Sequence, residues 1–197
     1  MKYNPDTNHC CSIRLKGYDY SQDGAYFVTI CTHNRECLFG KIVDNEMTLN
    51  DYGKIVYEEW FLSAKIRNEI RLYENEFVIM PNHIHGIVWV IYNDNVGATG
   101  RSPLQKNHLP YYDNPHGPKN KSLSSFIAGY KSSVTKKINQ IRQTPCIPVW
   151  QRNYYEHIIR NEIELNKIRE YILNNPMNWE IDENYRIWKN IFVKTHR

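Results

Sequence analysis

The chain has 197 residues, of which 41% are hydrophobic and 23% charged, and its formal net charge is +4 at pH 7. These proportions are typical of a globular domain and argue against a disordered or fibrous chain. The apolar runs are far shorter than the ~20 residues that span a bilayer, and the first residues contain no apolar targeting core. We therefore expect one domain over residues 1–197, in the cytoplasm and without a membrane partner.

Two strands and a helix are predicted first. Residues 25–32 are rich in β-branched and aromatic side chains and predict a long strand, and residues 37–43 predict a short one. The segment Leu49-Asn50-Asp51 offers a helix cap, and apolar residues recur after it at helical spacing. This pattern predicts an amphipathic helix from about Asp51 to Arg67.

Two more strands and a loop follow. The apolar runs 70–80 and 83–92 predict strands, and the short connection Pro81-Asn82 favours antiparallel pairing between them. Residues 93–121 are polar and rich in Gly, Pro, Asn and His, without periodicity. They predict a long flexible loop, of a length that is often functional.

The C-terminal part is predicted to hold two helices. Ser122 or Ser124 can cap the first, which runs to about Gln143 with apolar residues on one face and lysines on the other. An aromatic, partly extended link precedes the second helix, which begins near residue 161 and is followed by a tail to residue 197. The order of elements predicts an α+β fold in which helices cover one face of a mainly antiparallel sheet.

His83 and His85 are separated by one residue in a predicted strand. Side chains alternate faces along a strand, so both imidazoles point to one side while Ile84 points into the core. Such a pair can bind Mg²⁺, Mn²⁺ or Zn²⁺ when a third ligand completes the shell. The alternative is a pair of ordinary hydrogen-bonded histidines.

Basic residues are concentrated after the predicted loop. The stretch from Asn114 to Tyr155 contains no Asp or Glu, and its basic residues are Lys119, Lys121, Lys131, Lys136, Lys137, Arg142 and Arg152. Such a stretch can neutralise phosphates, although a solvated basic helix face without a partner would have the same composition. The candidate phosphate contacts are Lys131, Lys136, Lys137 and Arg152, of which Arg152 could instead pair with Glu156.

Several segments together carry a family resemblance. They are Gly17-Tyr18-Asp19-Tyr20 with residues 25–32, the run Val78-Ile79-Met80-Pro81-Asn82-His83-Ile84-His85-Gly86-Ile87-Val88, residues 149–160, and Tyr171-Ile172-Leu173-Asn174-Asn175-Pro176. In content and order they resemble the IS200-like single-tyrosine transposases with a His-hydrophobic-His (HUH) motif. The resemblance is closer to the REP-associated tyrosine transposases and spans nearly the whole chain.

This resemblance implies a ferredoxin-like α+β fold, with Mg²⁺ or Mn²⁺ bound by His83 and His85. It further implies a tyrosine that attacks a phosphodiester of single-stranded DNA at hairpin-forming sequences, which leaves a 5′-phosphotyrosine and a free 3′-hydroxyl. A phenol has a pKa near ~10 and needs a neighbouring cation to act as a nucleophile at neutral pH. We expect the enzyme to work as a homodimer, in which one subunit's helix could serve the other's metal site.

In the family the nucleophile lies on a helix downstream of the HUH strand. The only tyrosine of the helix predicted over 122–143 is Tyr130, which makes Tyr130 the predicted catalytic residue. Its position on the apolar stripe would equally suit a core aromatic with a hydrogen-bonded hydroxyl. Tyr154 and Tyr155 are the alternative nucleophiles.

The third metal ligand is not evident. Many family members carry a Gln or Asn one helical turn after the tyrosine, but Val134 occupies that position here. His157, Asn82 and Gln151 are the possible replacements. Two alternative functions stay open: a DNA-binding protein of the same fold that has lost strand transfer, and an unrelated metal-dependent hydrolase that activates water.

Overall fold

The structure is a computed structural model that describes residues 22–91, 120–182 and 184. The loop predicted over 93–121 falls almost entirely outside the described residues. In chain order, with η for a 3-10 helix, the elements are β1 (Gly24–Cys31), η1 (His33–Arg35), β2 (Gly40–Val43), β3 (Glu46–Leu49), α1 (Asp51–Lys65), β4 (Ile70–Arg71), η2 (Glu74–Glu76), β5 (Phe77–Met80), β6 (His83–Val90), α2 (Leu123–Ile141), β7 (Tyr155–Ile159), α3 (Glu162–Asn174) and η3 (Pro176–Ile181).

The main sheet is antiparallel, in the order β4-β6-β1-β7, with β5 also paired to β6. β1 and β6 form its centre, and their register sets His83 opposite Cys31 and His85 opposite Thr29. β2 and β3 form a separate hairpin. This combination of helices with an antiparallel sheet confirms the predicted α+β class.

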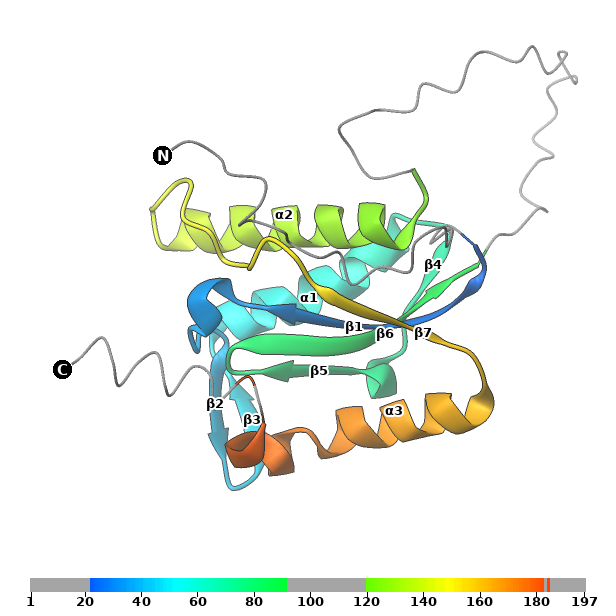
Figure 1. Ribbon diagram of the computed structural model, residues 1–197. Helices are drawn as coiled ribbons and strands as arrows, with labels where there is room; N and C mark the ends of the chain where they lie inside the picture. The colour runs from blue at the N-terminus through cyan, green and yellow to red at the C-terminus, as the bar shows by residue number, and fades with distance from the viewer. Residues whose placement is uncertain (1–21, 92–119, 183, 185–197) are drawn as a thin grey trace, which may run out of the picture.

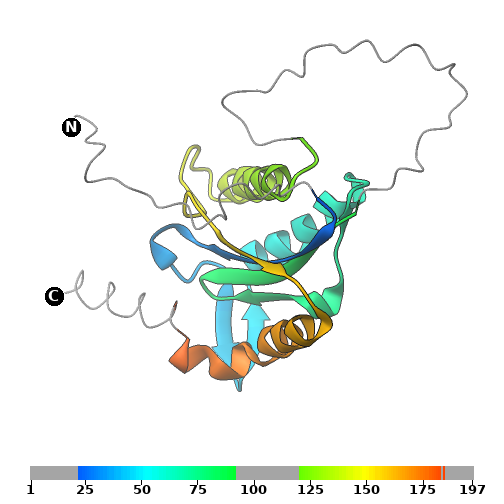
Figure 2. The same cartoon turned by 45° about the vertical axis from the view of Figure 1, so that its right-hand side comes forward.

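The two faces of the sheet contact different helices. On one face the sheet packs with α1 and α2 in the main core, whose members include Tyr26, Val28, Ile84, Val88, Trp60, Phe126 and Val134. On the other face Phe27 and Ile87 pack with Leu165 and Ile172 of α3. Figures 1 and 2 show α1 and α2 on one side of the sheet and α3 on the other. The prediction placed all helices on one face, but residues 165 and 172 lie seven positions apart and give α3 an apolar stripe of its own.

The helices begin at predicted caps. The side chain of Asn50 accepts a hydrogen bond from Gly53 N at 2.9 Å at the start of α1, and Ser122 rather than Ser124 caps α2, by accepting from Ser125 N at 3.2 Å. No helix in the described part of the chain is long and apolar enough to cross a membrane.

One predicted strand is divided, and one strand was not predicted. The segment 70–80 contains β4, η2 and β5, because Glu76 turns inward at the end of η2 and is 1% exposed. Its carboxylate accepts hydrogen bonds from Trp89 Nε1 and from Arg169 Nη2 of α3, both at 2.6 Å. An additional strand, β3, follows β2 because residues 44–45 adopt φ of 50° and 64°, as a tight hairpin turn requires.

Gly86 lies in the centre of β6, where the sheet meets α1. A Cβ atom there would come within 2.7 Å of Trp60 Cζ2 and 3.1 Å of Phe77 Cδ2. Because Trp60 is fully buried and has no room to move, we expect Gly86→Ala to lower the free energy of unfolding in urea by about 1–3 kcal/mol. Gly24→Ala is the matched control, since its Cβ would meet the Tyr26 hydroxyl oxygen at 3.5 Å and the ring at 3.6 Å, both ordinary contact distances. Equal stabilities of the two variants would contradict this close packing.

Candidate active site

His83 and His85 begin β6 and point to the same face of the sheet, as the strand alternation predicts. Their Nε2 atoms lie 2.9 Å apart, and the residues are 0% and 2% exposed. Ile84 between them belongs to the main core on the opposite face. The two imidazoles therefore converge on one buried point on the face that α3 covers.

Asn82 fixes the proton on His83. Its Nδ2 donates to the carbonyls of Arg35 at 3.1 Å and Asn184 at 3.2 Å, which leaves Oδ1 as an acceptor. This Oδ1 lies 2.7 Å from His83 Nδ1, so Nδ1 carries the proton. The other nitrogen, Nε2, then presents a lone pair to the site, the form in which an imidazole binds a metal. Asn82 thus orients a candidate ligand, and its own side-chain atoms are engaged in these hydrogen bonds.

His85 is held by groups from two elements. Its Nδ1 lies 2.8 Å from Thr29 Oγ1 of β1, and its Nε2 lies 3.3 Å from Tyr171 Oη of α3. Because His83 Nε2 is an acceptor without a proton, it repels His85 Nε2 at 2.9 Å unless a proton or a cation lies between them. With the His85 proton on Nδ1, both Nε2 atoms are available as metal ligands.

Burial keeps both imidazoles neutral. It lowers the pKa of His85 from 6.5 to about 3, and it lowers that of His83 well below 6.5, an effect to which the neighbouring His85 and Arg35 add. Metals bind the neutral form of histidine, so neither side chain needs to lose a proton at pH 7.

The same burial predicts a dependence of stability on pH. His85 has a pKa near 6.5 in the unfolded chain and about 3 in the folded chain. The stability that neutral His85 contributes to the folded state is therefore full above pH 6.5 and is lost as the pH falls from 6.5 towards 3. At pH 5 the loss amounts to about 2 kcal/mol for one such histidine. We expect the urea midpoint of the chelator-treated protein to fall between pH 7 and 5. An unchanged midpoint would contradict a buried neutral pair.

One oxygen donor lies beside the histidines, and a second lines the cavity next to them. The ligand atoms of His83, His85 and Asp182 all lie within 4.8 Å of one another. Asn175 is 2% exposed, and its Oδ1 has no hydrogen-bond partner among the described residues. Asn175 and Asp182 line the same cavity as His85 and Tyr171. Two imidazoles, a carboxylate and an unpartnered amide oxygen form a donor set that suits a divalent ion.

Tyr171 brings a phenol to the same point. Its ring packs edge-on against Phe27 at 6.0 Å and against His85 at 5.1 Å between centroids. The residue is 45% exposed and lines a cavity of about 770 Å³. Its helix is anchored nearby, because Nε and Nη2 of Arg169 donate to the buried Glu76 Oε1 at 2.9 and 2.6 Å. The phenol is therefore both positioned and accessible.

The structure does not bring Tyr130 to the histidines. Tyr130 is 0% exposed in the main core on the opposite face, next to Trp60 and Phe126, and its hydroxyl donates to Val56 O at 3.2 Å. Burial raises the pKa of Tyr130 well above 10. The prediction of Tyr130 as the nucleophile is therefore corrected, because an enclosed neutral phenol cannot reach a phosphodiester. Val134, one turn later, is also a core residue.

The four predicted phosphate contacts differ in their surroundings. Lys131 Nζ donates to two carbonyls in the segment before β7, at 2.6 and 3.0 Å. Lys137 Nζ pairs with the buried Glu59 at 2.5 Å. Lys136 and Arg152 line a second cavity, of about 520 Å³, between α2 and the segment before β7. Two of the four side chains are thus engaged within the protein.

The alternative nucleophiles and the possible third metal ligands lie in two different places. Tyr154, Tyr155 and Gln151 line the cavity that contains Tyr171. His157 instead pairs with Glu164 at 2.6 Å, at the start of α3. His157 is therefore occupied by a helix contact away from the histidine pair.

Tyr171, Asn175 and Asp182 are the residues of this site that the sequence analysis did not assign. Tyr171 and Asn175 stand four positions apart at the end of a predicted helix, which is the tyrosine and amide spacing sought at Tyr130. Asp182 belongs to no periodic pattern, and no sequence signal points to it.

Comparisons with known proteins bear on family and fold. No protein-family model matches the chain. A protein of Haemophilus influenzae, described only as uncharacterized, is 42% identical over 184 residues, which are 93% of this chain and 97% of that protein. A solved REP-associated tyrosine transposase bound to a REP hairpin has a TM-score of 0.50 and 17% identity, over 84% of this chain and 74% of that one. A crystal structure from Deinococcus radiodurans has a TM-score of 0.41 and 17% identity, over 82% and 95%.

Proposed function

The chain belongs to the same family as the Haemophilus influenzae protein, and we propose for it the activity of a metal-dependent transposase that cuts and rejoins single-stranded DNA at hairpin-forming sequences. The HUH segment supports this proposal, as does the likeness of fold to a transposase bound to a hairpin. The observation that carries it is the 3.3 Å contact between Tyr171 Oη and His85 Nε2 beside an open cavity.

The histidine pair would hold the metal. His83 and His85 would bind Mg²⁺ or Mn²⁺ through Nε2, with Asn175 or Asp182 as the third protein ligand. The two facing Nε2 atoms, both acceptors when His85 carries its proton on Nδ1, and the unpartnered amide oxygen fit such an ion. When bound, it would withdraw charge from phosphate oxygens and favour a nearby phenolate.

Tyr171 takes the place of Tyr130 as the proposed nucleophile. Its oxygen attacks the phosphorus, the bond from phosphorus to the 3′ oxygen breaks, and the phenol proton ends on that 3′ oxygen. The products are a 5′-phosphotyrosine and a free 3′-hydroxyl. Attack by another 3′-hydroxyl on the phosphotyrosine reverses the step and joins strands, which is what transposition requires.

The surrounding side chains position these groups. Asn82 and Thr29 orient the imidazoles, and Phe27 supports the rings of both His85 and Tyr171. Because α3 lies over the histidines of its own chain, the proposed site uses the helix of the same subunit. The homodimer stays a prediction about assembly only.

DNA binding is proposed to extend from this site to the second cavity. Lys136 and Arg152 would contact phosphates there, and binding would weaken as salt is raised. Lys131 would act indirectly, because its ammonium group already holds the segment before β7.

The proposal is tested with a hairpin oligonucleotide that has single-stranded flanks and a label at its 3′ end, the end that would stay attached to the protein. The full chain is incubated with it and Mn²⁺ or Mg²⁺, and the products are separated on a denaturing gel. A covalent adduct that a chelator prevents is the expected result. Binding without an adduct would indicate a DNA-binding protein of the same fold, and cleavage without an adduct would indicate a hydrolase.

A further inference from the structure

The cavity beside Tyr171 extends past the residues that the proposed chemistry uses. Its volume is about 770 Å³, and beyond His85 and Tyr171 its walls include Tyr155, Gln151 and Asn153. We propose that this part of the cavity binds an unpaired nucleobase next to the phosphodiester that is cut, with Tyr155 as the surface on which the base stacks. The inference rests on the proposed function and adds a substrate subsite to it.

The register of the sheet places Tyr155 in line with the candidate metal ligands. Thr29 lies opposite Tyr155 on one side and opposite His85 on the other, so the three side chains form a row on one face across β7, β1 and β6. Since neighbouring strands are about 4.8 Å apart, the backbones of Tyr155 and His85 are separated by roughly 10 Å. A nucleotide adjacent to a phosphate at the histidine pair would reach this position.

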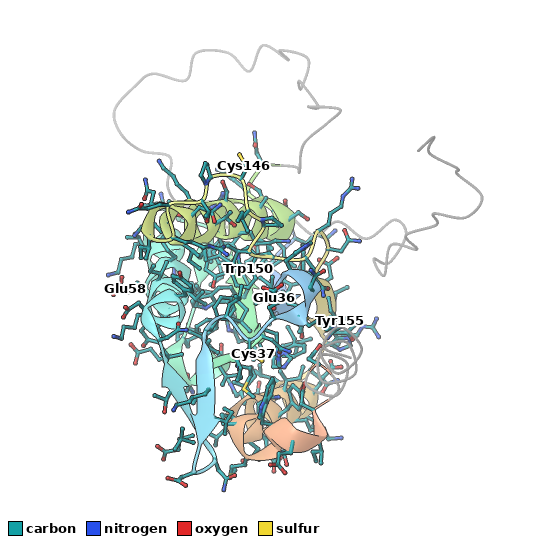
Figure 3. The ribbon with its side chains drawn as sticks, turned by 90° about the vertical axis from the view of Figure 1, so that its left-hand side faces the viewer. Glu36, Cys37, Glu58, Cys146, Trp150 and Tyr155 are labelled. Carbon is teal, nitrogen blue, oxygen red and sulfur yellow. The ribbon has the colours of Figure 1, made fainter. Side chains whose placement is uncertain are left out.

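Tyr155 is the first residue of β7 and is exposed; its position is labelled in Figure 3. The residue is 46% exposed, and its ring meets Phe27 edge-on, with centroids 6.4 Å apart and planes inclined by 69°. An edge contact holds a ring in place while leaving a face for stacking. Phe27 also meets Tyr171 edge-on, at 6.0 Å, so one core aromatic supports both the proposed nucleophile and the proposed stacking surface.

The segment that leads to Tyr155 is fixed from both sides. Lys131 of α2 donates to the carbonyl of Gln151 at 2.6 Å and to the next carbonyl at 3.0 Å. The backbone N–H of Gln151 donates to Cys31 O of β1 at 2.9 Å. The amide side chains of Gln151 and Asn153 therefore line the cavity on an anchored segment. Amides both donate and accept hydrogen bonds, as base edges do, which favours a nucleobase over a second phosphate at this end of the cavity.

The test compares Tyr155→Ala and Tyr155→Phe in the full chain with Mn²⁺. The substrates are hairpin oligonucleotides in which each position flanking the cut is replaced in turn by an abasic residue, and Kd, KM and kcat are measured. Tyr155→Ala should raise Kd and KM about 5- to 100-fold with little change in kcat, and Tyr155→Phe, which keeps the ring, should stay within about twofold. At one abasic position the Kd and KM of the parent should rise by the same factor as they do in Tyr155→Ala on the unmodified substrate. The same abasic substrate should cause no further rise in Kd or KM for Tyr155→Ala.

Tyr73→Ala is the matched control, because Tyr73 is 50% exposed and packs edge-on against Trp89, outside the cavity. Parent-like Kd and KM for Tyr155→Ala, or a loss that is the same on every abasic substrate, would overturn the subsite. If Tyr155→Ala forms the adduct with a parent-like KM, the proposed chemistry is supported and the proposed subsite is refuted. No adduct from the parent would contradict the proposed chemistry, and the Kd comparison would then still decide whether a base stacks on Tyr155.

Discussion

Tyr171→Phe is expected to abolish the covalent adduct with DNA, to below about one thousandth of the parent rate, while binding of the hairpin stays within about twofold. The substitution removes only the oxygen that would bond to phosphorus. The ring contacts with Phe27 and His85 remain available, so the helix and the cavity should keep their shape. Adduct formation is read from a denaturing gel and hairpin binding from fluorescence anisotropy.

Single Tyr→Phe changes elsewhere provide the controls. Tyr130→Phe loses one buried hydrogen bond to Val56 O and should cost about 1 kcal/mol of stability without loss of the adduct. Tyr154→Phe and Tyr155→Phe alter side chains of the cavity that Tyr171 lines, and both variants should still form the covalent adduct. If Tyr171→Phe forms the adduct at the parent rate, another tyrosine is the nucleophile, and mass spectrometry of the DNA-linked peptide would identify it.

The choice between Tyr130 and Tyr171 depends on the tertiary packing of their helices, which the residues around each tyrosine do not reveal. Both residues lie on helices downstream of the histidine strand, so the order of elements does not separate them. What separates them is the face of the sheet on which each helix packs. α2 packs with α1 in the main core on one face of the sheet. After α2 the chain forms the edge strand β7, which pairs with β1, and then continues on the other face, so that α3 lies on the face that holds the histidines.

Features with a short-range cause were predicted correctly. The alternation of a strand places His83 and His85 together and Ile84 in the core, and local side chains such as Asn50 set the helix starts. Features that depend on distant partners were not predicted. Glu76 interrupts a predicted strand because it is bonded to a residue of α3, 93 positions away. Asp182 reaches the histidines only because η3 follows α3 across the same face.

Loss of metal binding is the second large effect that we expect. His83→Ala should weaken Mn²⁺ binding by at least about a hundredfold, measured by electron paramagnetic resonance or calorimetry, because it removes one of two preoriented imidazoles. His157→Ala is the matched control, since His157 pairs with Glu164 and lies outside the cluster, and its Mn²⁺ affinity should equal that of the parent. Circular dichroism of His83→Ala checks that the variant is folded. Parent-like Mn²⁺ affinity in folded His83→Ala would refute the metal site.

The same titration decides which oxygen completes the site. Asn175→Ala and Asp182→Ala each remove one candidate donor, and the variant that loses about 10- to 100-fold in Mn²⁺ affinity identifies the ligand. Asn175 lies one helical turn after Tyr171, so a metal bound through Asn175 would connect the ion directly to the helix that carries the proposed nucleophile. Asp182 follows η3, and a metal bound through Asp182 would connect the C-terminal segment to the sheet instead.

The two possible ligands also predict different rates. If Asn175 is the ligand, Asn175→Ala should reduce the rate of adduct formation even at saturating Mn²⁺, because the phenol loses its fixed position relative to the ion. In the second case saturating Mn²⁺ should restore the rate in Asp182→Ala, since Tyr171 is positioned independently by Phe27 and by its helix.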